Sequence, residues 1–148
     1  MTHSESQRIV PNNTVACFTD GGLTGDNGFL RTFTLNDFAI AHGFEVTDVS
    51  FGVEAVNLGP SVVTVRLYIL DGETLTYDNM TEIGSAAVTL QPQALEMVTV
   101  PVTATAPAGS TLVVELDAPD TSQTIVFFAG SNAEGGSAPS YLRAVAGG

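Results

Sequence analysis

The chain has little positive charge: its 148 residues include no lysine, four arginines and 16 acidic residues, so its formal charge is −12. Nucleic-acid binding depends on cations that displace counterions from phosphates, and anionic membranes attract polybasic segments. The shortage of cations therefore argues against both partners. The acidity fits an exported protein, a salt-adapted protein, a binder of cations, or a surface that is acidic only for solubility.

The chain also has few of the residues that most often carry out chemistry. It contains one cysteine, Cys17, and two histidines, which are too few for a convincing zinc site. The sequence has no G-x-S-x-G, H-E-x-x-H, P-loop or C-x-x-C motif. Paired carboxylates for glycoside hydrolysis stay open, but no spacing singles out one pair. We therefore predict that the protein is not an enzyme, with a glycoside hydrolase as the least favoured alternative.

Long apolar runs are absent as well. Nothing approaches the roughly 20 apolar residues of a transmembrane helix, so we predict no membrane insertion. The first residues, MTHSESQ, lack the basic and apolar regions of a signal peptide. The sequence is then either cytoplasmic or a mature segment of an exported protein, and we favour export for the resemblance given below.

What the sequence does have is strict alternation of apolar and polar residues. From Val49 to Leu70 two such runs are joined by Asn57-Leu58-Gly59-Pro60, which predicts two long strands and a tight connection. In the first run Val49, Phe51, Val53 and Ala55 should point to the core.

Similar short runs, separated by Gly, Pro, Asn and Asp turns, recur along the chain. They predict an all-β antiparallel sandwich, jelly-roll-like, with roughly eight to ten strands. Pro101 cannot donate to a ladder, so its strand should lie at an edge or carry a bulge. We expect residues 1–14 to form a polar N-terminal arm and residues 15–148 to form a single domain.

One loop is a candidate metal site. The stretch from Thr19 to Gly28 is rich in glycine and contains Asp20, Asp26 and Asn27. Calcium takes six to eight oxygens from carboxylates, amides and carbonyls, which such a loop can supply. We therefore predict structural calcium as the candidate cofactor. The alternative is a turn in which Asp or Asn bonds its own backbone.

Arg66, the third arginine of the chain, belongs to a candidate ligand-binding face. Thr64, Arg66 and Tyr68 lie on the side of their strand opposite Val65 and Leu67, so they could line an exposed sheet face. Tyrosine rings beside charged and hydroxyl groups suit sugars, although the lack of tryptophan weakens this case. The alternative is that this face packs against the second sheet or an adjoining domain.

A recurring module is indicated by five segments, residues 27–38, 44–55, 63–70, 100–120 and 127–144. They resemble β-sandwich accessory domains of large secreted bacterial proteins, and in broad pattern P-domains and carbohydrate-binding modules. The resemblance implies an extracellular, non-catalytic module, with structural calcium as one of its features, and carries no individual binding residue.

Two functions of different kinds follow. The first is a secreted binding or adhesion module that attaches to polysaccharide, a cell surface or a protein partner. The second is a structural subunit that assembles into a homo-oligomer, fibre or surface layer, with the arm of residues 1–14 adding to a neighbouring copy as a strand. An exposed face carrying Arg66 and Tyr68 would favour the first function.

Overall fold

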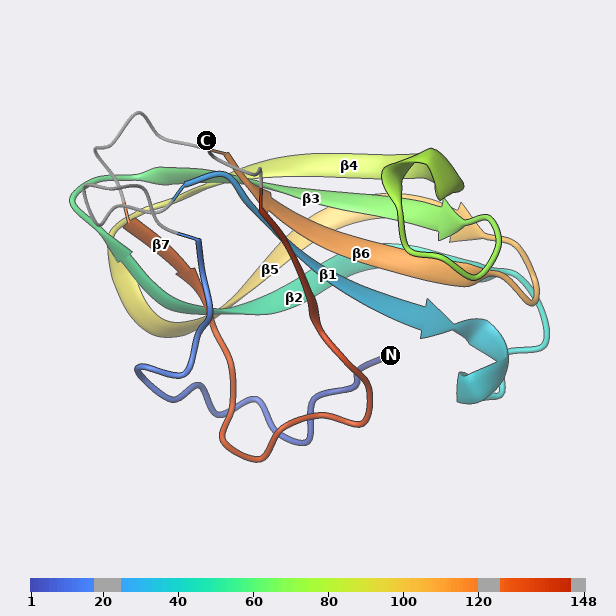
Figure 1. The fold of residues 1–148 in the computed structure, drawn as a ribbon, viewed down its shortest axis with the longest axis horizontal. Helices are drawn as coiled ribbons and strands as arrows, with labels where there is room; N and C mark the ends of the chain where they lie inside the picture. Colours follow the sequence, from blue (N-terminus) through green and yellow to red (C-terminus); the bar gives the residue numbers. More distant parts are fainter. Residues whose placement is uncertain (18–24, 120–125, 145–148) are drawn as a thin grey trace.

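The computed structural model describes residues 1–17, 25–119 and 126–144, which form eight β-strands and two short 3-10 helices (Figure 1). The helices are η1 (Leu35–Phe38) and η2 (Tyr77–Asn79). The strands are β1 (Asn27–Thr34), β2 (Phe44–Asn57), β3 (Ser61–Leu70), β4 (Met80–Leu90), β5 (Gln93–Ala106), β6 (Thr111–Ala118), β7 (Val126–Ala129) and β8 (Tyr141–Ala144). Neither helix has the length or apolar character to cross a bilayer.

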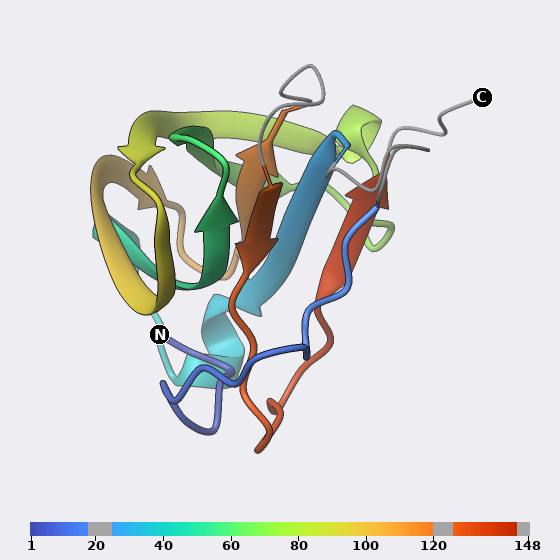
Figure 2. The same cartoon turned by 90° about the vertical axis from the view of Figure 1, so that its left-hand side faces the viewer.

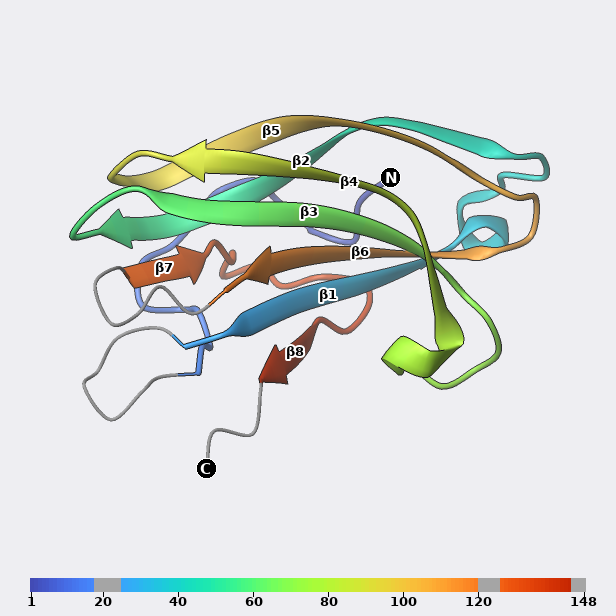
Figure 3. The ribbon, with the colours of Figure 1, turned by 90° about the horizontal axis from the view of Figure 1, so that it is seen from above.

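The strands form two antiparallel sheets packed face to face. The larger sheet has the order β4-β3-β6-β1-β8 and the smaller has the order β5-β2-β7 (Figure 3). Pairing is nested along the chain, because β1 pairs with β8, β2 with β7 and β3 with β6. This is the winding of a jelly roll. The prediction of an all-β antiparallel sandwich is confirmed.

The core lies between the sheets and follows the alternation of the strands. Val63, Val65 and Leu67 of β3 and Val53 of β2 are completely buried. At the end of β2 the structure differs from the prediction. Ala55 was expected to point to the core, but Val56 is the buried residue. A register shift between Val53 and Ala55 adds a residue to β2, and such a bulge reverses the alternation beyond it.

The two strands predicted between Val49 and Leu70 are confirmed, but they are not a hairpin. β2 pairs with β5 and β7, whereas β3 pairs with β4 and β6. The connection at Leu58-Gly59-Pro60 therefore carries the chain from one sheet to the other. The edge position predicted from Pro101 is also confirmed, because β5 is an edge strand and its register shifts beside this proline.

Residues 1–14 run along the segment that follows β7 (Figure 2). Ser4 forms a β-bridge with Gly136, and Val10 N–H donates to the carbonyl of Ser131 at 3.0 Å. Ile9 lies against Gly52 of β2, where an added Cβ would stand only 3.0 Å from its side chain. The arm thus covers an outward-facing part of the smaller sheet within its own chain.

Candidate functional site

The candidate site lies on the outer face of the larger sheet, away from the sandwich core. Alternation in β3 points Val65 and Leu67 inward and Arg66 and Tyr68 outward. In β6 the same alternation points Glu115 outward, in register with Arg66. The alternative that this face packs against the second sheet is therefore wrong.

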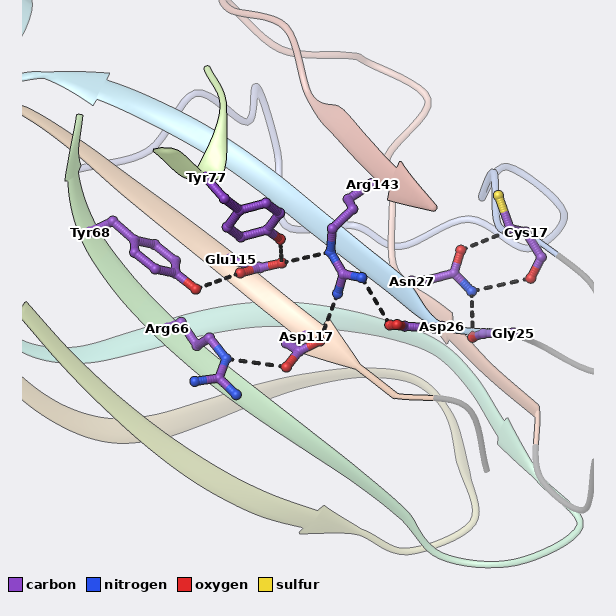
Figure 4. A network of polar contacts seen from close by, with 10 residues as sticks. All are labelled: Cys17, Gly25, Asp26, Asn27, Arg66, Tyr68, Tyr77, Glu115, Asp117 and Arg143. Carbon is purple, nitrogen blue, oxygen red and sulfur yellow. Dashed lines mark hydrogen bonds and ion pairs between the residues drawn. The ribbon is translucent and has the colours of Figure 1, made fainter. Parts of the chain in front are cut away.

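Glu115 is the centre of the site, although its side chain is only 1% exposed. Its Oε2 accepts a hydrogen bond from the Tyr68 hydroxyl at 2.9 Å, and its Oε1 accepts one from the Tyr77 hydroxyl (Figure 4). Arg143 Nε donates to the same Oε1 at 3.3 Å. A buried carboxylate is tolerated only when it is paired and hydrogen-bonded, and three donors from three different elements meet that need here.

Arg143 connects this buried carboxylate to the more exposed part of the site. Its NH1 contacts Asp26 at 3.0 Å and its NH2 contacts Asp117 at 2.8 Å. Asp117 in turn accepts from Arg66 Nε at 3.1 Å (Figure 4). Opposite charges thus alternate across β8, β6 and β3, which fixes the side chains in place.

The site depends on the absence of a side chain at one position of β1, the strand between β6 and β8. Gly28 of β1 stands between Asp117 on β6 and Arg143 on β8 in the ladder. A Cβ at this position would lie 2.4 Å from Glu115 Oε1 and 2.7 Å from Arg143 Nε. Only glycine leaves room for the two charged groups to meet across the strand.

Burial and charge shift the pKa values of the groups around Glu115. Burial raises the pKa of Tyr68 and of Tyr77, and the hydrogen bonds to the Glu115 carboxylate raise both further. Burial opposes the charge of Arg143, but Tyr77, Asp26 and Glu115 more than offset it and raise its pKa. The site is therefore held as neutral tyrosines and charged arginines at neutral pH.

These shifts predict a stability that declines at high pH. In the unfolded chain tyrosine hydroxyls lose their protons near pH 10, whereas Tyr68 and Tyr77 keep theirs to higher pH in the folded protein. Above about pH 10 the folded state then binds more protons than the unfolded state, so the free energy of unfolding falls as pH rises. Tyr68→Phe should make this decline shallower in urea unfolding series, and the exposed Tyr141 supplies the control variant Tyr141→Phe. An unchanged slope in Tyr68→Phe would contradict the assignment.

An open pocket of about 440 Å³ lies over these groups. Its volume falls within the roughly 300–1,000 Å³ of small-molecule sites. The lining includes two guanidinium groups, three carboxylates and two tyrosines, so it offers donors and acceptors in nearly equal number. The lining residues are Asp26, Arg66, Tyr68, Tyr77, Glu115, Asp117 and Arg143.

Of the three predicted ligand-binding residues, Arg66 and Tyr68 line the pocket and Thr64 does not. Thr64 shares the outer face and stands in register with Asp117. Glu115 and Asp117 could have been found from alternation in their strand, since both lie opposite Leu116. Arg143 and Tyr77 are of the exposed type in the sequence, but no pattern places Arg143 in this site, because it meets Asp26 across 117 residues of sequence.

The predicted calcium ligands have other partners in the described residues. Asp26 pairs with Arg143, and the side-chain amide of Asn27 accepts the Cys17 N–H at 2.7 Å and donates to the Cys17 carbonyl at 3.1 Å. Asp20 lies outside the described residues. Among the residues that the structure describes, no group of three His, Cys, Asp or Glu side chains could hold a metal ion. Calcium stays a prediction, which a fall in melting temperature on adding EDTA would support.

Comparisons with known proteins do not identify this chain. No protein-family model matches it, and neither the curated proteins nor the solved structures yield a match.

Proposed function

We propose that the protein is a non-catalytic extracellular module that binds polysaccharide through the pocket over Glu115. One observation carries the proposal: charged and hydroxyl side chains from β3, β6, β8, η2 and the residue before β1 converge on one open face. The extracellular location rests on the sequence resemblance to accessory domains of secreted bacterial proteins. Calcium belongs to this proposal only as a structural ion.

The chemistry of the pocket suits a neutral polyhydroxylated ligand. A sugar hydroxyl both donates and accepts, so neighbouring hydroxyls can bridge an arginine and a carboxylate. The pocket contains charges of both signs, which gives no strong preference for an anion or a cation. Arg66 and Asp26 supply the accessible partners, with side chains 34% and 33% exposed.

Binding accounts for the site better than hydrolysis does. A glycosidase needs two carboxyl groups in unlike environments, so that one gives a proton while the other stays ionised. Here Glu115 and Asp117 are both bonded to the same guanidinium, that of Arg143. Each of the two carboxyl groups therefore has a positive partner, so neither stands in the apolar surroundings that suit a proton-donating carboxyl group.

Binding to an array of plant and microbial polysaccharides tests the proposal. Arg66→Ala should weaken binding at least about tenfold, equivalent to ~1.4 kcal/mol. Arg8→Ala is the matched control, because it removes the same charge from the arm, where the Arg8 side chain is 69% exposed and pairs with Glu134. Equal losses in both variants, or no binding by the parent protein, would contradict the proposal.

A second candidate is self-assembly through the arm. Residues 1–14 bond to the segment after β7, including Ser137 N–H to the His3 carbonyl at 2.8 Å, and a second copy could supply the same contacts in exchange. The arm-exchange function requires a solution mass above that of one chain, and a return to monomer when residues 1–14 are deleted. Light scattering decides between the candidates, and the binding module is expected to be monomeric.

A further inference from the structure

The two arginines of the polar pocket have few free donors for a ligand. All three nitrogens of the Arg143 guanidinium donate to carboxylates: Nε to Glu115 at 3.3 Å, NH1 to Asp26 at 3.0 Å and NH2 to Asp117 at 2.8 Å (Figure 4). A carboxylate or sulfate binds an arginine best through two parallel hydrogen bonds to neighbouring nitrogens. Arg143 offers no such pair, because each of its nitrogens already has an acidic partner.

Arg66 is the other arginine of the pocket, and two carboxylates hold it as well. Its Nε donates to Asp117 and its NH1 donates to Glu82, both at 3.1 Å. Among the described residues only its NH2 has no carboxylate partner, and a bidentate contact needs a second nitrogen. An anionic ligand would therefore displace either Asp117, whose side chain is 18% exposed, or Glu82, whose side chain is 39% exposed. Glu82 is the more accessible of the two.

Glu82 reaches Arg66 because of an irregularity in β4. The register between β3 and β4 shifts after Leu67, so that Tyr68 stands opposite Glu82 rather than Ile83. Directly opposed residues of antiparallel strands share a face of the sheet, and Glu82 therefore lies on the outer face with Arg66 and Tyr68. Glu82 does not line the pocket itself but contacts a residue that does. Its charge thus stands at the border of the site.

The charges around the pocket disfavour an anionic ligand. Three carboxylates and two guanidinium groups line it, which leaves one excess negative charge, and Glu82 adds another. The formal charge of the whole chain, −12, has the same sign, but at 0.1 M salt exposed charges more than about 10 Å away are largely screened. Discrimination against anions should therefore depend on the carboxylates next to Arg66, and of these Glu82 is the exposed one.

We propose that the site selects uncharged saccharides over acidic ones, and that Glu82 is the residue that sets this preference. The inference rests on the proposed function and adds its specificity. A uronic acid or a sulfated sugar would place its anion beside Arg66, where Glu82 already holds NH1 and repels a second anion. An uncharged sugar meets no such repulsion, since its hydroxyls can donate to the carboxylate and accept from the free NH2.

Calorimetric titration with matched saccharides tests the inference. Galacturonic acid oligomers are compared with the same oligomers after methyl esterification. The polysaccharide that binds best on the array is compared with its product after oxidation of primary hydroxyls to carboxyl groups. In at least one pair the uncharged member should bind about tenfold more tightly or better. The ratio should fall between about 0.1 M and about 1 M salt, because salt screens the repulsion of charges but not a difference in shape.

Two variants separate Glu82 from the charge of the chain as a whole. Glu82→Gln removes one negative charge beside the pocket and should lower the ratio of uncharged to acidic binding at least about threefold. Glu134→Gln is the matched control, because Glu134 is also paired with an arginine and its side chain is 37% exposed, close to the 39% of Glu82. The control variant should leave the ratio unchanged.

The outcomes separate the two proposals. Equal binding of both members of each pair, or a best array ligand that is itself acidic, would overturn the specificity while the saccharide-binding function stands. Equal ratios in Glu82→Gln and Glu134→Gln would overturn the assignment to Glu82. Failure of every saccharide to bind would overturn the proposed function and the inference with it.

Discussion

Glu115→Ala is expected to lower the free energy of unfolding by about 2–4 kcal/mol. The substitution leaves the buried Tyr68 hydroxyl without its acceptor, which costs about 1–3 kcal/mol, and it also removes the acceptor of the Tyr77 hydroxyl and the packing of a fully buried side chain. Arg143 keeps Asp26 and Asp117, so the loss stays below the value for a buried charge with no partner. Urea unfolding followed by circular dichroism measures the difference.

Two further variants make this test decisive. Glu82→Ala removes an exposed partner of Arg66 on the same sheet and should cost at most about 1 kcal/mol. Glu115→Gln keeps the side-chain volume but turns an amide N–H₂ toward a donor, so its loss should fall between the other two. A Glu115→Ala protein as stable as Glu82→Ala would show that the buried carboxylate does not hold the site together.

Gly28→Ala should destabilise the protein by about 1–3 kcal/mol, the usual cost of placing extra atoms in a filled space. The new methyl carbon would overlap the Glu115 carboxylate and the Arg143 side chain and force them apart. Because the effect acts through overlap with the Glu115 side chain, it should be smaller when Glu115 has already been replaced by alanine. The four unfolding curves of this double-mutant cycle measure the coupling.

Gly43→Ala is the control for this second prediction. A Cβ there would meet its nearest neighbour, the Ala106 carbonyl, at 3.5 Å, which is ordinary contact. We expect no loss of stability, and a gain of a few tenths of a kcal/mol from the stiffer unfolded chain would agree with this. Equal losses of stability in Gly28→Ala and Gly43→Ala would contradict a specific role for the missing side chain at Gly28.

Local pattern was enough to predict the strands but not their partners. Alternation around Val65 and Leu67 gives a strand with one buried face wherever that strand lies in the sandwich. The sheet that a strand joins depends on contacts with distant segments. For this reason β2 and β3 lie in different sheets, although the tight connection between them suggested a hairpin. The bulge that turned Val56 inward likewise comes from pairing with β7.

The same limit applies to the site. Arg66 and Tyr68 were found because they share a face of one strand. Arg143 reaches Glu115 across 28 residues of sequence, and the reason for Gly28 appears only when the ladder sets it between them. No local pattern contains these relations, since they arise from the order of strands in the larger sheet.

Tyrosine ring signals in NMR test the central claim most directly, because the chain has three tyrosines and no tryptophan. We predict that adding the polysaccharide that binds best shifts the ring signals of Tyr77, whose side chain is exposed and lines the pocket. Backbone signals of residues 1–14, which run along the segment after β7 and do not line the pocket, should stay in place. Shifts confined to the arm or to β5, with Tyr77 unchanged, would contradict the assignment of this face as the binding site.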